Sequence, residues 1–326
     1  MKIMIVGGTG FLGYHSLLEA HSRGHSVNAL AIDDVELGDW YPGNVNVEYG
    51  DVFELSEDDL RRRFKGHDAM IYAVGPDDRI TPPAPAYGFF HKRLVDSVEK
   101  VANAARKSGI KRFVLLNSYF AYFHRIWPEK ELTRHHPYIR CRVEQAEQVI
   151  AAGKDKMDVM VLELPYIFGS MPERIPLWKD VLLDRFAKGN IIFFPKGGTN
   201  MIAVEHVGEA IIGALENGEH GERYVVGDED HTYNEMLEMM MSAIGESKRI
   251  INIPRPMAVL AGRMIEKGWK KKGLEGGLDA GYLMKDIMTD YLYFDPSYSA
   301  KKLGYKRGGL KEAITNTMKA CYPEKF

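Results

Sequence analysis

The chain begins with the apolar run Met1-Lys2-Ile3-Met4-Ile5-Val6 and passes directly into Gly7-Gly8-Thr9-Gly10-Phe11-Leu12-Gly13. The glycines keep Gly-x-x-Gly-x-x-Gly spacing. This spacing suits a tight turn from a strand into a helix, a close approach of backbone to a pyrophosphate, and close packing of the helix on the sheet. Residues 14–23 have a helical pattern, so an anion would rest on a helix N-terminus. The turn therefore predicts dinucleotide binding, with contacts from Gly7, Gly10, Phe11, Leu12 and Gly13.

Apolar strand-like runs alternate with helical segments through the first half of the chain. This order favours an α/β fold with a doubly wound parallel sheet of the Rossmann type. Further strands are expected at residues 27–32, 45–49, 69–74, 113–116 and 159–164. Helices are expected at residues 89–108 and 138–152, where Gly109 and Gly153 mark the ends. Beyond about residue 165 the pattern changes to loops and shorter helices, at residues 204–216, 233–244 and 310–319.

Bulk composition is that of a soluble cytoplasmic enzyme. The 326 residues are 45% hydrophobic, enough for one large domain or two closely joined ones. The net charge of -2 offers no electrostatic reason to expect a nucleic-acid partner. Two cysteines are too few for a disulfide framework, and no secretory signal is apparent. A homodimer is left open.

The nearest approach to a membrane segment is the apolar stretch 256–265. It is short, contains Arg263, and is followed by Lys267, Lys270, Lys271 and Lys272. Either a surface-lying amphipathic helix or an ordinary docked helix fits this pattern, and the docked helix is favoured. No membrane partner is expected.

Tyr138 and Arg142 lie four positions apart in a predicted helix. Side chains at i and i+4 point from the same helix face, so the guanidinium would favour the phenolate of a tyrosine acting as an acid or base. The adjacent His135 and His136 lack the spacing of a zinc pair, and an exposed loop pair is the favoured interpretation. No metal site is expected.

These features together resemble the extended short-chain dehydrogenases/reductases, the NAD-dependent epimerase/dehydratase family. The Tyr-x-x-x-Arg pair is similar to the family's Tyr-x-x-x-Lys signature, and residues 111–122 resemble its fifth strand with the following serine. Residues 201–207 and 294–305 resemble later segments of the family. The resemblance implies a dinucleotide-binding Rossmann domain at residues 1–165, to which parts of 200–230 return. A smaller C-terminal α/β substrate domain would occupy residues 166–326.

The resemblance also implies roles for individual residues. Tyr138 would be the general acid/base, Ser118 a hydrogen-bond donor to the substrate oxygen, and Arg142 the helper of the tyrosine. Tyr122 would shape the substrate site. Asp51 and Val52 would border the adenine, although Asp51 fits an ordinary turn equally well. The remaining implied cofactor contacts are Ala73, Val74, Gly75 and Pro165.

Two positions depart from the family pattern. Arginine at position 142 keeps the charge of the family's lysine but has a larger planar fork, so catalysis would be altered, slow or lost. An asparagine is common near the position of Leu94, and here it is absent.

The cofactor is expected to be NAD, with NADP as the alternative. In the family, a carboxylate at the end of the second strand usually binds the ribose hydroxyls of NAD. That position falls on Ala31 here, and Asp33 and Asp34 lie just beyond it. Two acidic residues disfavour a 2′-phosphate.

Three functions remain open. The first is an NAD(P)-dependent oxidoreductase or epimerase/dehydratase that acts on a hydroxyl or ketone, with a nucleotide sugar among the candidate substrates. The second is a non-catalytic dinucleotide-binding sensor or scaffold. The third and most distant is an RNA-associated atypical member, which the net acidity disfavours.

Overall fold

The computed structural model describes residues 1–32, 36–154, 156–186 and 189–326. Asp33 and Asp34, the acidic residues that bear on cofactor choice, lie outside these ranges.

The core of the fold is a sheet in which, among the described residues, seven strands run parallel. Their order is β10-β6-β5-β4-β1-β2-β3. The strands are β1 (Lys2–Val6), β2 (Ser26–Ala31), β3 (Asn46–Tyr49), β4 (Ala69–Tyr72), β5 (Arg112–Ser118), β6 (Asp158–Leu164) and β10 (Arg223–Val225). The predicted doubly wound parallel sheet is confirmed. β4 and nearly all of β1, β5 and β6 are buried, as expected for strands covered on both faces.

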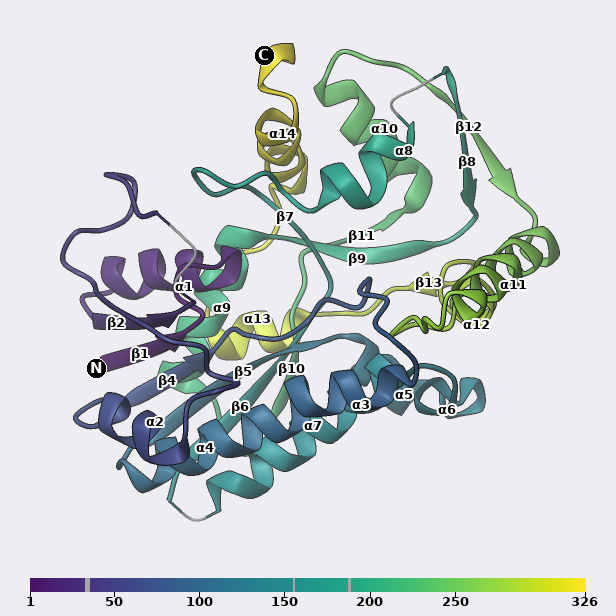
Figure 1. Cartoon of the computed structure of the whole chain (residues 1–326). Helices are drawn as coiled ribbons and strands as arrows, with labels where there is room; N and C mark the ends of the chain where they lie inside the picture. The colour runs from purple at the N-terminus through teal and green to yellow at the C-terminus, as the bar shows by residue number, and fades with distance from the viewer. Residues whose placement is uncertain (33–35, 155, 187–188) are drawn as a thin grey trace.

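Helices cover both faces of this sheet (Figure 1). On one face, α1 (Phe11–Ser22) packs against α9 (Val204–Asn217). On the other face lie α2 (Glu57–Phe64), α4 (Ser97–Lys107) and α7 (Pro137–Gly153). The apolar residues of β1 alternate between the two cores, because successive side chains of a strand point to opposite faces.

The helix expected at residues 89–108 differs from the prediction. The chain forms α3 (Ala86–Phe90), a π-helical stretch η1 (His91–Asp96) and then α4. The Ser97 hydroxyl donates to the Arg93 carbonyl and pairs with the Tyr72 hydroxyl, next to the wide turn. The spacing of apolar residues in the sequence does not reveal the π-helical stretch, because one wide turn rotates the apolar face of the helix without interrupting it.

The later part of the chain builds a second layer with its own core. A small sheet joins β7 (Tyr166–Phe168), β9 (Gly198–Ala203), β11 (Glu229–Thr232) and β13 (Tyr291–Leu292). β8 (Ile191–Pro195) pairs in parallel with β12 (Arg249–Ile253). α10 (Tyr233–Ala243) and α14 (Leu310–Cys321) bury their apolar faces here. β10 and α9 belong to the large sheet and its cover, so the chain crosses between the layers more than once.

The remaining elements connect these layers. α11 (Arg255–Lys271) and α12 (Ala280–Asp286) lie side by side at the right-hand edge of Figure 1. The others are α5 (Phe120–Ile126), η2 (Pro128–Lys130), α6 (Leu132–His135), η3 (Lys179–Leu183), α8 (Asp184–Phe186), α13 (Ser297–Leu303) and η4 (Pro323–Lys325). Of the helices within the described ranges, none is both long and apolar enough to cross a membrane.

Gly13 is the tightest contact of the first strand–helix turn, since a Cβ there would lie 2.1 Å from the Gly7 carbonyl oxygen. We expect Gly13→Ala to lower the free energy of unfolding by about 1–3 kcal/mol, because α1 would have to move off the turn. Chemical denaturation measures this. Gly88→Ala in α3 is the control, because its Cβ would meet no atom within 4 Å. Equal stability of the Gly13 variant and the parent would contradict this packing.

Candidate active site

The glycine turn connects β1 to α1 and leaves room in front of the helix. Gly7 has φ +90, and a Cβ there would lie 2.7 Å from the Ala73 carbonyl oxygen. Gly10 caps α1 in an extended conformation, and among described atoms its Cβ would meet only the Gly7 oxygen, at 3.2 Å. The first N–H groups of a helix have no acceptor within it. Gly10 therefore borders open space at the helix N-terminus, where the pyrophosphate of a dinucleotide is expected, and Phe11 and Leu12 begin the helix beside it.

The other predicted site residues follow neighbouring strands at the same edge of the sheet. Val6 is in register with Tyr72, and Tyr72 with Leu115. Further along, Ser118 is in register with Leu164, directly before Pro165. β1 lies between β4 and β2, so the strand order reverses here, and at such a point ligands of doubly wound sheets bind outside the carboxyl ends of the strands. The fold thus gathers Gly7, Ala73, Ser118 and Pro165 along one edge.

Leu94 packs closely against the backbone of Gly75. Gly75 has φ +152, and a Cβ there would lie 2.7 Å from Leu94 Cδ2. Leu94 is buried in η1, beneath the loop that follows β4. Leu94 therefore packs where a polar asparagine is usual, and Val74 lies beside the glycine turn.

The residues predicted to border the adenine have structural roles among the described residues. Asp51 follows β3, and its Oδ1 accepts a hydrogen bond of 2.8 Å from the Phe53 amide. Val52 is buried in the core with α2 and α4. Asp51 thus acts as a turn residue, and the cofactor roles of Asp51 and Val52 stay predictions. Ala31 is buried at the end of β2.

Tyr138 and Arg142 meet directly on α7. Arg142 Nε donates to the Tyr138 hydroxyl at 2.9 Å. Arg142 Nη1 donates to Gln145 Oε1 at 2.9 Å and to the Leu116 carbonyl at 3.3 Å. Within the described part of the chain, Nη2 makes no hydrogen bond. The guanidinium is thus held by β5 and α7, with one nitrogen still available.

Asn117 was missed by sequence reasoning and sets the position of α7. Its amide nitrogen donates to the Arg142 carbonyl at 2.9 Å, and its side-chain oxygen accepts from the Ser118 amide. This buried amide therefore joins the serine and the arginine. A polar residue before Ser118 in an otherwise apolar strand is the signal that could have revealed it.

Burial controls the acidity of Tyr138. The side chain is 4% exposed, and its ring contacts that of Phe90 edge-on. Burial raises the pKa of Tyr138 to about 12, although Arg142 lowers it; Asp78 and Asp77 raise it further. Arg142 lowers the pKa of Tyr138, but burial outweighs this effect. The proton therefore stays on Tyr138 at neutral pH.

Ser118 serves the backbone as well as the site. Its hydroxyl oxygen accepts from the Phe120 amide at 3.3 Å, as a residue at a strand end commonly does. The hydroxyl proton is not used by that bond. Ser118 can therefore still donate to a substrate oxygen.

Tyr122 lies on α5 and packs against the apolar cluster that includes Tyr138. Its ring contacts those of Phe294 and Phe123. Tyr119 is buried in the same cluster, and its hydroxyl pairs with the Thr199 hydroxyl at 2.9 Å. The substrate role of Tyr122 stays a prediction.

The loop after β4 carries three charged residues that sequence reasoning overlooked, and two of them, Asp77 and Asp78, raise the pKa of Tyr138 after burial as the main cause. Asp77 binds the Arg79 guanidinium through both carboxylate oxygens. Burial, followed by the charge of Asp77, raises the pKa of Asp78 to about 6. The Arg79 guanidinium lies 6.0 Å from the ring centre of Trp178. An acidic pair two residues after the site glycine Gly75 was the available signal.

The histidine pair is not an exposed loop, contrary to expectation. His136 is fully buried ahead of α7, and burial lowers its pKa to about 4. Its Nδ1 accepts from the Asp279 amide at 3.1 Å. His135 stacks on Tyr282 at 3.5 Å. Segment 273–279 covers the two histidines, and its distance along the chain is why the sequence did not reveal their burial. The described residues include no group of three or more metal-binding side chains.

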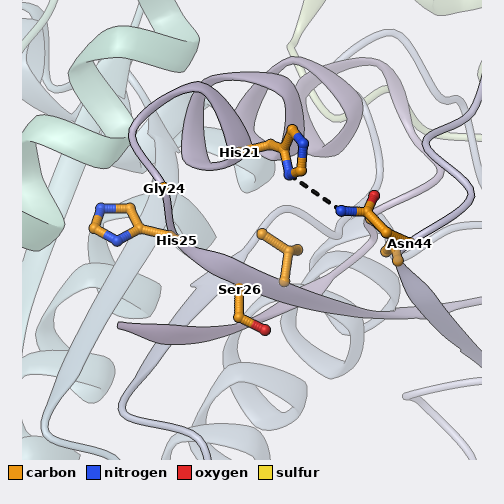
Figure 2. Close-up of a pocket in the computed structure, with 7 residues that line it drawn as sticks. His21, Gly24, His25, Ser26 and Asn44 are labelled. Atoms are coloured by element: carbon orange, nitrogen blue, oxygen red, sulfur yellow. Dashed lines mark hydrogen bonds between the residues drawn. The ribbon is translucent and has the colours of Figure 1, made fainter.

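A cavity of about 300 Å³ lies at the opposite edge of the sheet (Figure 2). Its lining includes His21, which meets the Asn44 amide at 3.4 Å, and His25, which pairs with Glu216 at 2.9 Å. β2 and β3 begin here, whereas Gly7 and Ser118 lie at strand carboxyl ends. This cavity is therefore separate from the dinucleotide site.

Gly10 allows a test of cofactor binding that leaves the fold intact. We expect Gly10→Val to weaken NAD and NADP binding at least about tenfold, because its side chain would fill the space before α1. Calorimetry gives the affinity, and an unchanged melting temperature shows that the turn is preserved. Undiminished affinity in the folded variant would contradict the site.

The comparisons with known proteins agree with this geometry. The family model described as NAD(P)H-binding matches residues 7–167. Mouse sterol-4-alpha-carboxylate 3-dehydrogenase, decarboxylating, is 24% identical over 67% of this chain, but the match spans only 59% of the mouse protein. Sterol demethylase protein B of Methylococcus capsulatus is 23% identical over 78% of each chain.

Solved structures share the fold over the whole chain. The crystal structure of gox2253 matches with a TM-score of 0.79 at 18% identity, and the match covers 99% of this chain and 98% of the gox2253 chain. The Bordetella bronchiseptica enzyme WbmH, solved with NAD+, has a TM-score of 0.71 at 16% identity, with coverage of 99% and 98%. The chain therefore carries an NAD(P)H-binding domain and shares the fold of these structures, in agreement with the predicted resemblance to the extended short-chain dehydrogenases/reductases.

Proposed function

We propose that this protein is an NAD-dependent oxidoreductase that interconverts a secondary alcohol and a ketone on an apolar carbon skeleton, with Tyr138 as the acid/base. The observation that carries the proposal is the 2.9 Å hydrogen bond from Arg142 Nε to the Tyr138 hydroxyl, in a buried site at the carboxyl edge of the sheet. A buried tyrosine paired with a cation is suited to proton transfer.

In the reducing direction, Tyr138 donates its proton to the substrate oxygen. Arg142 then stabilises the phenolate that remains, and in the oxidising direction the phenolate takes the proton back. The Ser118 hydroxyl donates to the same oxygen and orients it. Arg142 Nη2 is available for a ribose hydroxyl of the cofactor. A bound nicotinamide cofactor would supply the hydride as NADH in the reducing direction and accept it as NAD+ in the oxidising direction.

The surroundings of Tyr138 favour an apolar substrate. Phe90 packs on its ring, and Tyr166 and Trp178 form an aromatic cluster near Asp78. Arg79, the cation of this loop, is engaged by both oxygens of Asp77 and is poorly placed to bind a diphosphate. Two relatives carry sterol in their names, which fits a fused-ring alcohol or ketone better than a nucleotide sugar.

Tyr138→Phe is expected to reduce turnover by at least about a thousandfold and to leave NAD affinity almost unchanged, because the hydroxyl acts on substrate. Cofactor consumption with a panel of sterol, ketone and sugar-nucleotide substrates measures the rate, and calorimetry the binding. Wild-type activity that survives in Tyr138→Phe would refute the mechanism. A parent that binds NAD but turns over no substrate would instead favour a dinucleotide sensor.

Arg142 is expected to support turnover by its charge. Arg142→Met should slow the reaction and move its alkaline pH dependence upward, since the phenolate loses its cation. Arg142→Lys should keep or raise activity, and it serves as the charge-preserving control. Equal rates in Arg142→Met and the parent would contradict the assignment.

Asp78 offers a test through pH. Burial is the main cause of the raised pKa of Tyr138, and the negative charge of Asp78 raises that pKa further. Asp78→Asn removes the charge, so we expect the Tyr138 inflection in the pH profile of kcat/KM to move to lower pH. The inflection is expected to move to lower pH in both reaction directions. Asp58→Asn on α2 is the matched control, because Asp58 is largely exposed. An unmoved inflection in Asp78→Asn would show that another group controls the profile.

A further inference from the structure

α11 presents an apolar row to solvent. Met257, Leu260 and Met264 are 62%, 61% and 67% exposed. Their i, i+3, i+7 spacing places them on one face of the helix. Three large apolar side chains in one exposed row are unusual for a helix whose surface meets only water.

The opposite face of α11 is what attaches it to the molecule. Among its 17 residues, Ala258 and Gly262 are the buried ones. A Cβ at Gly262 would lie 2.2 Å from the Ala280 carbonyl oxygen, so α11 and α12 cross closely there. Small residues thus anchor the helix. The apolar row faces away from this contact and adds nothing to the internal packing.

Basic residues accompany the row. Between residues 255 and 272, six side chains are basic and only Glu266 is acidic, while the whole chain has a net charge of -2. Lys267, Lys270 and Lys271 are exposed, and none forms an ion pair within the described residues. This segment is therefore a concentrated positive region on a slightly acidic protein.

We propose that α11 docks on the surface of an anionic lipid bilayer. A helix with an apolar row and flanking lysines lies in the membrane interface, where its apolar side chains reach the acyl boundary and its cations meet the headgroups. A second copy is a poorer occupant of this face, because paired α11 helices would bring their positive charges together. The docking is peripheral and needs no spanning helix. The sequence left a surface-lying helix open, although it favoured a docked one.

α11 is tied to the catalytic region by the segment that follows it. The Ala84 amide donates to the Gly273 carbonyl, and the Glu275 amide to the Pro82 carbonyl. The Tyr138 amide donates to the Gly277 carbonyl at 2.9 Å. A bilayer bound to α11 would therefore lie beside the site, and an apolar substrate could pass from the bilayer into it. This consequence rests on the proposed function, but the docking itself does not.

Vesicle binding tests the docking without any turnover. The full chain should co-sediment with vesicles of phosphatidylcholine containing phosphatidylserine, much less with pure phosphatidylcholine, and less as salt rises. Leu260→Ser/Met264→Ser should abolish binding. Lys270→Gln/Lys271→Gln should weaken it roughly 10- to 30-fold.

Two matched controls separate the face from general surface effects. Leu177→Ser removes an apolar side chain that is 59% exposed in a different loop. Lys311→Gln/Lys319→Gln removes two exposed charges from α14, which lies away from α11 in Figure 1. Both controls should bind vesicles like the parent, and circular dichroism verifies folding throughout.

The proposal is overturned if the parent does not bind phosphatidylserine vesicles, or if both α11 variants bind as the parent does. It is also overturned if the parent is a dimer in analytical ultracentrifugation, Leu260→Ser/Met264→Ser makes it monomeric, and vesicles have no effect. That result would assign the face to a second copy of the chain. None of these outcomes depends on the Tyr138 chemistry, so the two proposals fail separately.

Discussion

The close contact between Gly13 and Gly7 is the constraint on which the rest of the site depends. It brings the N-terminus of α1 onto the end of β1, between β2 and β4, where the sheet order reverses. A side chain at Gly13 would push α1 away from the end of β1, and one at Gly7 would collide with Ala73 and Val74 of the loop after β4. Because the strands are parallel, the same edge also receives Ala73, Ser118 and Pro165. The dinucleotide site thus follows from one packing requirement.

The chemistry depends on a balance of burial against charge at Tyr138. Burial raises the pKa of the phenol to about 12, and Arg142 only partly compensates. The arginine is itself fixed by Gln145 and the Leu116 carbonyl. Replacement of the family's lysine therefore preserves a directed cation. Its planar fork reaches several acceptors at once, as an ammonium does less readily.

The loop after β4 and the segment after α11 connect this chemistry to the outer layer. Asp78 adds negative charge next to Tyr138, while Gly277 accepts a hydrogen bond from the Tyr138 amide. α11 extends from the same segment with its apolar row and lysines outward. One connected region thus contacts Tyr138 on one side and presents the apolar row of α11 on the other.

The amino-acid sequence by itself determined the strand–turn–helix at residues 2–22, the parallel order of the first strands and the pairing of Tyr138 with Arg142. The turn and the tyrosine–arginine pair are encoded by spacing within a single turn or helix, which backbone geometry converts directly into position. The parallel order is encoded by the alternation of strands and helices along the chain. The tertiary structure alone decided the burial of Tyr138 and His136, the approach of Asp78, the π-helical turn before α4 and the exposure of the α11 row. These properties depend on which distant segments cover a residue and remove it from water. Such packing is set by the whole fold, because no local pattern records what will lie on top of it.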